Sequence, residues 1–381
     1  MRFTAPTPFL SRPVRVCGIQ YALRPVKDFS AFAEQVENYV DVGDDYDSDV
    51  IVFPELLAVQ LLSCVTRDFA PAEAMRCLAE TFTDGFEDLF LRLSTKYDRI
   101  IVAGTHPRFV DGKLQNVASV FVPGHGPVHQ PKLHLTPTER KVWRFEPGHE
   151  IHIIETDFGR MGVSICYDVQ FPEVARIQAE QGVQLLVVPY LTDDRRGYSR
   201  VTTCARARAV ENQIYVVTAG MVGSLPLITD LTAQYAQSGV YTPSDFPFPM
   251  DGIATEAAPN SEMVLVGDID LAVLDQTRAR GSVLNHQDAA EDGLRVSFDG
   301  RIHVHHLPWL NRRTGRRSRA EPLSGLFRAS GRFEGRGRGH ERRHHQGEAS
   351  RCRRRAWGQC GPRRPGASRR SARWFAPALM V

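Results

Sequence analysis

Cysteine is scarce in this chain of 381 residues, and its arrangement excludes two common ways of stabilising a fold. The seven cysteines are Cys17, Cys64, Cys77, Cys166, Cys204, Cys352 and Cys360. Their number is odd, and no two of them are separated by just two residues. This pattern argues against a disulfide framework and against a cysteine zinc site. It favours a reducing compartment, and we predict a cytoplasmic protein.

Long apolar runs are also lacking. No segment approaches the roughly 18 to 20 consecutive apolar residues that span a bilayer. The stretch 1–14 has two arginines and three prolines but no continuous apolar core, so it does not read as a signal peptide. With 42% hydrophobic residues, the chain can still bury a large core. We therefore expect a soluble protein with no membrane partner.

Lysine is absent from the C-terminal part of the chain. Residues 311–381 contain 20 arginines, four glutamates and no lysine, a net charge of +16, whereas residues 1–310 carry −13. This segment is rich in Gly, Ala, Pro and Ser and has too few apolar residues to offset the entropy of ordering it. We predict an N-terminal extension at 1–13, a folded domain at 14–310 and a disordered tail at 311–381.

The arginine-rich tail admits several interpretations. Its segment 336–339 resembles RGG-type sequences, and Trp357 and Trp374 offer rings for stacking on bases, which would make the protein a nucleic-acid binder. The tail could instead be a solvated extension or a partner of the chain's own acidic surface. It also has the composition expected of out-of-frame translation of GC-rich DNA, since arginine entirely replaces lysine. We favour the last interpretation and expect no nucleic-acid partner.

Apolar periodicity predicts strands that alternate with helices. Strands are expected at 15–21, 50–53, 100–104, 117–122, 151–155, 161–165, 185–189, 214–219 and 263–270. Helices are expected at 28–42, 73–97, 172–181 and 200–212. The pair Asp111-Gly112 predicts a hairpin turn. Strands that alternate with helices but include hairpins indicate a mixed α/β sheet protein and not an all-parallel barrel.

Three of the apolar segments end in residues that are costly to bury. Glu55 follows the apolar run 50–53, Cys166 follows 161–165, and Lys132 follows Pro131. A carboxylate, a thiol and an ammonium at strand ends are the parts of an enzyme that forms a covalent intermediate.

Each of these residues has a chemical role that fits its surroundings. Cys166 would be the nucleophile, and the backbone N–H of Tyr167 would face a developing oxyanion. Burial would raise the pKa of Glu55 and suit it to a general base. Lys132 would lower the pKa of the thiol and stabilise negative charge. Glu139 would hold Lys132 in place or orient the leaving group. Each residue taken alone also has a simpler interpretation. Cys166 could be a structural cysteine, Glu55 a surface acid and Lys132 a solvated lysine.

The flanking sequences extend the pattern. Asn116 precedes the strand at 117–122, Phe171-Pro172-Glu173 follows the cysteine, and 206–213 reads Arg-Ala-Arg-Ala-Val-Glu-Asn-Gln. Over roughly residues 14 to 292, the chain resembles the nitrilase (carbon–nitrogen hydrolase) superfamily. The resemblance implies an α/β fold, a four-layer αββα sandwich of two mixed sheets, assembled as a homodimer or a higher homo-oligomer. It also implies hydrolysis through a thioester or thioimidate with no metal and no organic cofactor.

The same resemblance assigns residue roles within a carbon–nitrogen hydrolase domain at 14–310. Glu55 is the expected base and Cys166 the nucleophile, while Lys132 and the Tyr167 N–H stabilise the oxyanion. Glu139 matches the second glutamate often counted with the site. The implied reaction is amidase-type hydrolysis of a non-peptide carbon–nitrogen bond in a small amide or nitrile.

A further set of charged residues is assigned to structure and not to catalysis. We expect them to form buried ion pairs that position the loops of the site. They are Asp168, Glu173, Arg206 and Arg208.

Departures from the commoner patterns point to one branch of the superfamily. Segments 54–62, 188–195 and 241–247 are similar to a less characterised branch whose members sometimes carry an N-acetyltransferase domain before the hydrolase. Only about fourteen residues precede the first predicted strand, so we expect that domain to be absent here. Tyr190, Thr192 and Asp193, with Asp194, follow a core strand and are expected to border the substrate pocket. Their acidity suggests a cationic substrate, although loop acids are also often simply solvated.

Other chemistries compete with this hypothesis. A Cys–His hydrolase would pair Cys166 with His134 or His129, but the chain lacks the local sequences of known Cys–His families, and Glu55 and Lys132 would go unexplained. We expect His134 to pack or to order a loop. A nitrilase, or an N-acyl transferase that passes the acyl group to an amine, would use the same residues, and sequence does not separate these alternatives.

Overall fold

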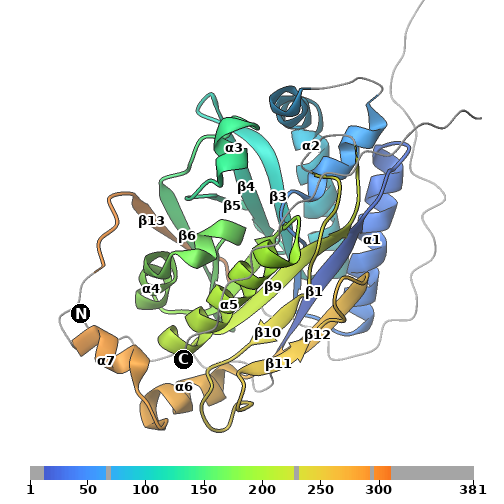
Figure 1. The fold of residues 1–381 in the computed structure, drawn as a ribbon. Helices are drawn as coiled ribbons and strands as arrows, with labels where there is room; N and C mark the ends of the chain where they lie inside the picture. The colour runs from blue at the N-terminus through green and yellow to red at the C-terminus, as the bar shows by residue number, and fades with distance from the viewer. Residues whose placement is uncertain (1–12, 66–69, 227–230, 292–295, 310–381) are drawn as a thin grey trace, which may run out of the picture. The chain divides into compact units, whose positions relative to one another are not determined.

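Two β-sheets form the centre of the computed structural model, which describes residues 13–65, 70–226, 231–291 and 296–309 (Figure 1). The first sheet contains β12 (Met263–Ile269), β1 (Val14–Leu23), β2 (Val50–Val52), β3 (Ile100–Val110), β4 (Lys113–Phe121) and β5 (Val128–Pro131). The second contains β13 (Arg301–His306), β6 (Glu150–Thr156), β7 (Gly159–Val163), β8 (Val183–Tyr190), β9 (Tyr215–Gly223), β10 (Gly239–Tyr241) and β11 (Ile253–Glu256). A short parallel pairing of β1 with β9 joins the two sheets.

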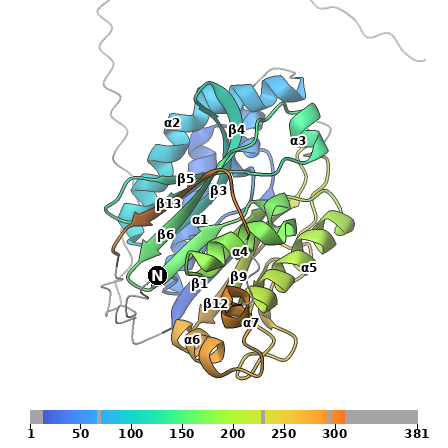
Figure 2. The same ribbon diagram turned by 90° about the vertical axis from the view of Figure 1, so that its left-hand side faces the viewer.

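Helices cover the outer face of each sheet, so the domain has four layers (Figures 1 and 2). Helices α1 (Phe29–Asp45) and α2 (Pro71–Tyr97) pack on the first sheet, and α4 (Pro172–Glu180) and α5 (Arg195–Asn212) pack on the second. The remaining helical segments are η1 (Leu57–Cys64), α3 (Pro137–Lys141), η2 (Cys166–Gln170), α6 (Leu271–Arg280) and α7 (Asn285–Glu291). The predicted αββα sandwich of two mixed sheets is confirmed.

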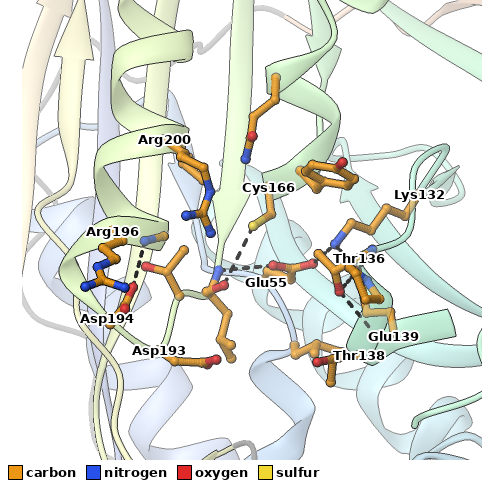
Figure 3. A pocket seen from close by; sticks show the side chains of 18 of the residues that line it. Glu55, Lys132, Thr136, Thr138, Glu139, Cys166, Asp193, Asp194, Arg196 and Arg200 are labelled. Atoms are coloured by element: carbon orange, nitrogen blue, oxygen red, sulfur yellow. Dashed lines mark hydrogen bonds and ion pairs between the residues drawn. The ribbon is translucent and has the colours of Figure 1, made fainter. Parts of the chain in front are cut away.

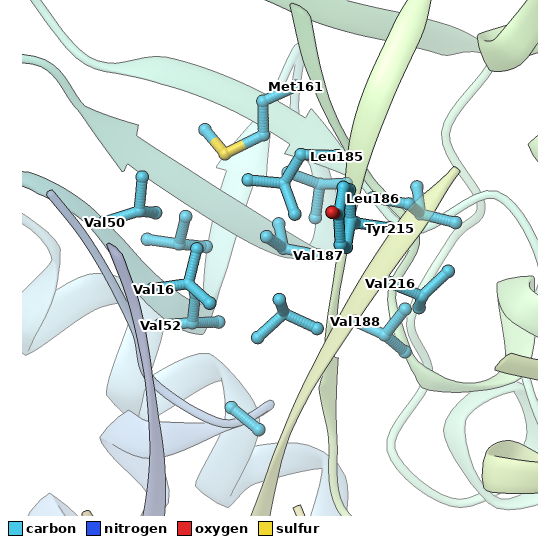
Figure 4. Packing of buried hydrophobic residues seen from close by; sticks show 14 of the residues in the cluster. Val16, Val50, Val52, Met161, Leu185, Leu186, Val187, Val188, Tyr215 and Val216 are labelled. Atoms are coloured by element: carbon cyan, nitrogen blue, oxygen red, sulfur yellow. The ribbon is translucent and has the colours of Figure 1, made fainter. Parts of the chain in front are cut away.

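Alternation along the strands separates the layers, because successive side chains of a strand point to opposite faces. Val16, Val50 and Val52 of the first sheet face Leu185 and Val187 of the second, and these side chains form the core between the sheets (Figure 4). The intervening residues point the other way. They pack against the aromatic side chains of α1 and α2, and they are Cys17, Ile19, Ile51, Phe53 and Ile101.

The predicted strands and helices are all present, most of them longer than expected. The Asp111-Gly112 turn joins β3 to β4 with positive φ at both residues, as a two-residue hairpin requires. Helix α5 begins five residues earlier than predicted because Asp194 caps it, accepting a hydrogen bond from Gly197 N at 2.8 Å. The short strands β5, β10, β11 and β13 were not predicted, since none of them contains a continuous apolar run like that of β2, which is equally short.

Some predictions fall outside the part of the chain that the structure describes. The chain divides into units Met1–Arg316 and Arg317–Val381, and all described residues belong to the first. The predictions for the tail at 311–381 and for nearly all of the extension at 1–13 therefore stay predictions. None of the helices within the described ranges combines the length and the apolar character needed to cross a bilayer.

Candidate active site

The predicted acid, cation and thiol meet at one edge of the sandwich (Figure 3). Strands β1, β2 and β3 run parallel to one another, as do β7, β8 and β9, so their carboxyl ends lie at common sheet edges. Loops after the carboxyl ends of parallel strands are where α/β proteins usually place their ligands. Glu55 follows β2, Lys132 follows β5, and Cys166 follows β7.

Glu55 is fixed by a close approach between two strands. The carbonyl of Pro54 lies only 1.9 Å from where a Cβ on Gly104 would stand, and Gly104 has a φ of +65°, so only glycine fits there. Leu56, directly after the glutamate, has a φ of +52° and donates its N–H to Thr105 Oγ1 at 2.7 Å. These constraints turn the chain so that the Glu55 carboxylate, 2% exposed, points into the site.

Lys132 sits between two buried carboxylates. Its Nζ donates to Glu55 Oε1 at 2.7 Å and to both oxygens of Glu139, at 2.8 and 2.7 Å. Asn116 Nδ2 bridges the same two acids, at 2.9 and 3.0 Å. Thr136 caps α3 and donates its N–H and hydroxyl to Glu139 Oε2, both at 2.9 Å. The ammonium is thus held by charge and geometry, and the prediction that Glu139 positions Lys132 agrees with these contacts.

Cys166 occupies a strained turn at the end of its strand. Its φ is +47°, a left-handed conformation that is costly for a residue with a Cβ and that clusters at functional sites. The thiol Sγ lies 3.7 Å from the carbonyl of Leu191, whose N–H donates to Glu55 Oε2 at 3.1 Å. Cys166 begins the turn η2, and Tyr167 is its second residue. The first N–H groups of a helix have no intrahelical acceptor, so the Tyr167 N–H is available to a ligand.

Asp168 ties the cysteine loop to the lysine loop. Its carboxylate accepts hydrogen bonds from the N–H groups of Leu133 and His134, at 3.2 and 2.7 Å, and from His134 Nδ1 at 3.0 Å. One buried acid therefore fixes the position of Lys132 relative to Cys166.

The expectation of four buried ion-pairing residues was only partly correct. Arg208 is buried and bonds to Val169 O and to Glu211, in agreement with it. Glu173 and Arg206 are exposed, because both lie on the solvent faces of α4 and α5. Arg206 bonds to the carbonyl of Asp251 and so holds a different loop.

The two glutamates have opposite electrostatic environments. Burial raises the pKa of Glu55, only partly opposed by the Lys132 charge. Burial acts on Glu139 in the same direction, but the Lys132 charge and hydrogen bonds from Lys132, Thr136 and Asn116 outweigh it and lower the pKa. One ammonium cannot neutralise two buried carboxylates, so the pKa of the one with more hydrogen-bond support, Glu139, is lowered while that of Glu55 is raised.

The pKa of the Cys166 thiol differs from the expectation that Lys132 would lower it. Lys132 does act to lower the pKa of Cys166, as predicted, but burial and the neighbouring Glu55 charge raise that pKa well above its ordinary value. The Lys132 ammonium keeps its proton, since Glu139 and Glu55 overcome the effect of burial on its pKa. The raised pKa favours the neutral thiol form of Cys166, and a neutral thiol that is to act as a nucleophile needs a base at the moment of attack.

A cavity of about 690 Å³ opens onto these groups, a size suited to a small molecule. Thr192 and Asp193 line it as predicted, together with Tyr167, Thr138 and Trp143. The prediction for Tyr190 was wrong. That side chain is fully buried in the core, and its hydroxyl accepts the N–H of Gln237 at 3.0 Å. Tyr190 is the last residue of β8 and is not among the residues that line the cavity.

The polar wall of the cavity is not simply acidic. Asp194 serves as the cap of α5, and Arg196 and Arg200, in the first two turns of that helix, also line the cavity. Within the described residues, neither arginine has a carboxylate within ion-pair distance. Figure 3 shows the Arg200 side chain extending from α5 toward the side of the cavity that holds Cys166.

Neither histidine of the competing Cys–His hypothesis lines this cavity. The His134 ring stacks on Phe171 with centroids 3.6 Å apart and bonds to Asp168, so it packs and orders a loop, as expected. His129 bonds to Ser119 and Arg108, farther along the sheet.

Sequence reasoning missed several residues of the site. Asn116 and Asp168 were noted only as flanking or structural positions, and Thr136, Trp143 and Arg200 were not noted at all. An uncharged amide directly before the apolar run 117–122 was the available signal for Asn116, because a buried amide needs partners. Arg200 gave no signal, since exposed arginines on helices are common.

Comparisons with known proteins agree with the fold and show the family. The family model described as carbon–nitrogen hydrolase matches residues 14–279. The probable hydrolase YhcX of Bacillus subtilis is 43% identical over 286 residues, which are 75% of this chain and 55% of that protein. Omega-amidase NIT2 of Danio rerio is 32% identical over 243 residues, 60% of this chain and 79% of that protein. The chain belongs to the carbon–nitrogen hydrolase family, a family of enzymes.

Solved structures share the fold at low identity. Nit3 of Saccharomyces cerevisiae, a member of branch 10 of the nitrilase superfamily, aligns with a TM-score of 0.59 and 24% identity, covering 71% of this chain and 94% of that one. A mutant of the amidase from Nesterenkonia sp. AN1 aligns with a TM-score of 0.56 and 19% identity, covering 74% of this chain and 97% of that one. In that mutant amidase, the acetamide moiety of fluoroacetamide is attached covalently to the active-site cysteine.

Proposed function

We propose that this chain hydrolyses a non-peptide carbon–nitrogen bond of a small amide through a thioester on Cys166. The observation that carries the proposal is the buried contact of Lys132 Nζ with Glu55 and Glu139, at 2.7 Å each, in the cavity that also contains the strained Cys166. Family membership supports the reaction class, and two fully buried acids around one ammonium are costly to keep without a function.

In the first half of the reaction, Cys166 Sγ attacks the amide carbon while Glu55 accepts the thiol proton. The carbonyl oxygen becomes an oxyanion, and the Lys132 ammonium and the Tyr167 N–H donate hydrogen bonds to it. The carbon–nitrogen bond then breaks, and the nitrogen leaves as ammonia or an amine with the proton held by Glu55. A thioester remains on Cys166.

In the second half, water attacks the thioester carbon while Glu55 takes a proton from it. The carbon–sulfur bond breaks, the sulfur regains a proton, and the carboxylic acid leaves. Glu139 keeps Lys132 charged and in place throughout both halves. No step needs a metal or a cofactor.

Trapping the intermediate tests this mechanism. Intact-mass measurement after rapid quenching of the enzyme with a small amide should show the acyl mass, and peptide mapping should place it on Cys166. Hydroxylamine should compete with water and give a hydroxamate. Turnover with no covalent adduct, or an adduct on another residue, would contradict the proposal.

The same experiment separates the alternatives. Ammonia release from a primary amide supports the amidase reaction, and release from a nitrile supports the nitrilase reaction. An N-acyl transferase would form product only when an amine is added. A homodimeric or larger assembly and a cytoplasmic location stay predictions.

Two arginines on the cavity wall indicate the class of substrate. Arg196 and Arg200 line the cavity with no carboxylate partner among the described residues, so we infer that the substrate carries an anionic group at the end remote from the amide. Arginine suits this role because its planar fork binds carboxylates with two parallel hydrogen bonds. This replaces the cationic substrate suggested by Asp193 and Asp194.

A pair of substrates tests the charge preference. Succinamate has a carboxylate at the end remote from its amide, and butyramide has a methyl group instead. We expect Arg200→Met to lower kcat/KM for succinamate about 10- to 100-fold, the usual cost of a lost charged hydrogen bond, and to change butyramide little. Arg195→Met is the matched control, since Arg195 is exposed on the same helix and does not line the cavity. Equal losses on both substrates would contradict an anion site.

A further inference from the structure

A second polar cluster lies at the outer edge of the second sheet, on the neighbouring strands β6 and β13 (Figure 2). The two strands are parallel, with His303 beside His152 and Arg301 beside Glu150. Side chains two residues apart on a strand share a face, so Glu150 and His152 lie on the same face, as do His303 and His305. Ile154, next on the face of His152, belongs to the core between the sheets. The cluster therefore lies at the open edge of that core.

The cluster has the donor set of a transition-metal site. One nitrogen from each of His152 and His303 and a carboxylate oxygen of Glu150 lie within 4.8 Å of one another. His152 Nε2 is 3.4 Å from Glu150 Oε2, and His303 Nε2 is 3.7 Å from Glu150 Oε1. Two ligand atoms bound tetrahedrally to one zinc ion at about 2.1 Å stand about 3.4 Å apart. The two distances from histidine nitrogen to carboxylate oxygen are thus close to those around a shared ion.

Two hydrogen-bonding details favour nitrogen atoms that are ready to bind a metal. His152 Nδ1 lies 2.9 Å from His305 Nε2, and a proton on His152 Nδ1 leaves the lone pair on Nε2, the nitrogen that faces Glu150. His303 Nε2 is hidden from solvent and has no hydrogen-bond partner among the described residues, although such atoms are normally satisfied. Metal-binding histidines are typically oriented by a second hydrogen bond of this kind.

One positive group competes for the carboxylate. Arg301 Nη1 is 3.8 Å from Glu150 Oε1, but its side chain is 80% exposed and can turn into solvent. We propose that Glu150, His152 and His303 bind one zinc ion or a similar divalent transition metal, with water in the remaining position and His305 as a positioning residue. The ion would fasten β13 to β6 and would take no part in the reaction at Cys166. The scarcity of cysteine excluded a cysteine zinc site, whereas this one uses imidazole and carboxylate ligands.

Zinc titration of the full chain against a chromophoric chelator tests the site. Wild-type protein should bind one equivalent that His303→Ala and Glu150→Gln lose or weaken at least 10-fold. His306→Ala is the matched control, since His306 is on the same strand, exposed, and bonded to Glu155 instead. His305→Ala should weaken binding about 10-fold while the stoichiometry stays at one, as expected of a positioning residue.

Cobalt distinguishes this site from a metal on the thiol or on the histidines at 340–345. Cobalt(II) in the proposed site should show visible d–d bands without thiolate charge-transfer absorption, and His303→Ala should remove these bands. Equal zinc binding by wild type, His303→Ala and His306→Ala would overturn the proposal. Thiolate bands that vanish in Cys166→Ala but persist in His303→Ala would overturn it as well. None of these outcomes depends on the proposed amidase activity.

Discussion

The two polar clusters of this domain differ in how many of their polar atoms have hydrogen-bond partners within the protein. At the edge that holds the proposed active site, called the catalytic edge below, Glu55, Lys132 and Glu139 are almost fully buried, and each of their charged atoms has a partner at hydrogen-bond distance. At the outer edge, His303 is 39% exposed, and its Nε2 has no hydrogen-bond partner within the described ranges. Burial makes an unpaired charge expensive, so an interior site must be complete before its substrate arrives. A half-exposed site can leave a coordination position open for an ion.

This contrast predicts that changes at the catalytic edge affect activity most. We expect Cys166→Ala to abolish turnover, a loss of at least about 10³-fold, because Cys166 is the one cysteine among the described residues that line the cavity. The fold should persist, since thiol to methyl is a small change of volume. Steady-state ammonia release and thermal unfolding measure the two effects. Turnover that survives in this variant would remove Cys166 from the mechanism.

Glu55→Gln should lower kcat by roughly 10² to 10⁴-fold, the contribution of a general base. A base must be ionised, so in the wild-type enzyme kcat/KM should fall as the pH drops through the raised pKa of Glu55. The midpoint should therefore lie above the ordinary value of 4.5. Glu139 has a lowered pKa and stays ionised in that range.

A pH profile of kcat/KM checks the assignment, with Glu139→Gln as the comparison. That variant should lose rate but keep an acid limb, since its base is intact. In the wild-type enzyme, a midpoint of the acid limb of kcat/KM at or below pH 4.5 would show that another group is the base. The same conclusion would follow if the residual activity of Glu55→Gln kept an unchanged acid limb.

Lys132→Met tests how much the buried cluster of Lys132, Glu55 and Glu139 contributes to the free energy of unfolding. Removing the ammonium leaves two carboxylates buried without a counter-charge, and breaking a buried ion pair in this way costs about 3 to 5 kcal/mol. Urea unfolding measures the loss, with Lys141→Met as the control because Lys141 is exposed at the end of α3. If both variants unfold at the same urea concentration, the buried network does not stabilise the domain.

Sequence and structure agreed where a residue's position follows from local pattern. Strand ends after apolar runs located Glu55 and Cys166, and family motifs located Lys132. Contacts between distant segments could not be read in this way. The bridge from Asn116 to both glutamates, Asp168 between two loops, and Arg200 on the cavity wall depend on how β4, β7 and α5 pack together. The prediction for Tyr190 was wrong for a different reason, because one step along a strand reverses the face to which a side chain points.

The outer cluster was invisible from the sequence for a related physical reason. Glu150 and His152 are separated from His303 by about 150 residues, and β13 contains only two apolar residues, Ile302 and Val304, so no strand was predicted there. Parallel pairing in register brings the three side chains together. Sites built across an edge strand therefore need the sheet topology before their residues can be grouped.

The smallest predicted effect is that of His303→Ala on the free energy of unfolding, and it distinguishes the two clusters best. Without metal, His303→Ala should change the free energy of unfolding by no more than about 0.5 kcal/mol, because His303 Nε2 has no hydrogen bond to lose. With free zinc at about 100 times its dissociation constant, the wild-type chain should gain about 2.7 kcal/mol and the variant should gain none, since binding to the folded state alone stabilises it by mass action. Urea unfolding with and without zinc, in wild type, His303→Ala and His306→Ala, measures this difference. A large loss in metal-free His303→Ala would mean that the histidine supports the sheet by packing, and the outer cluster would then resemble the catalytic one in being complete without a ligand.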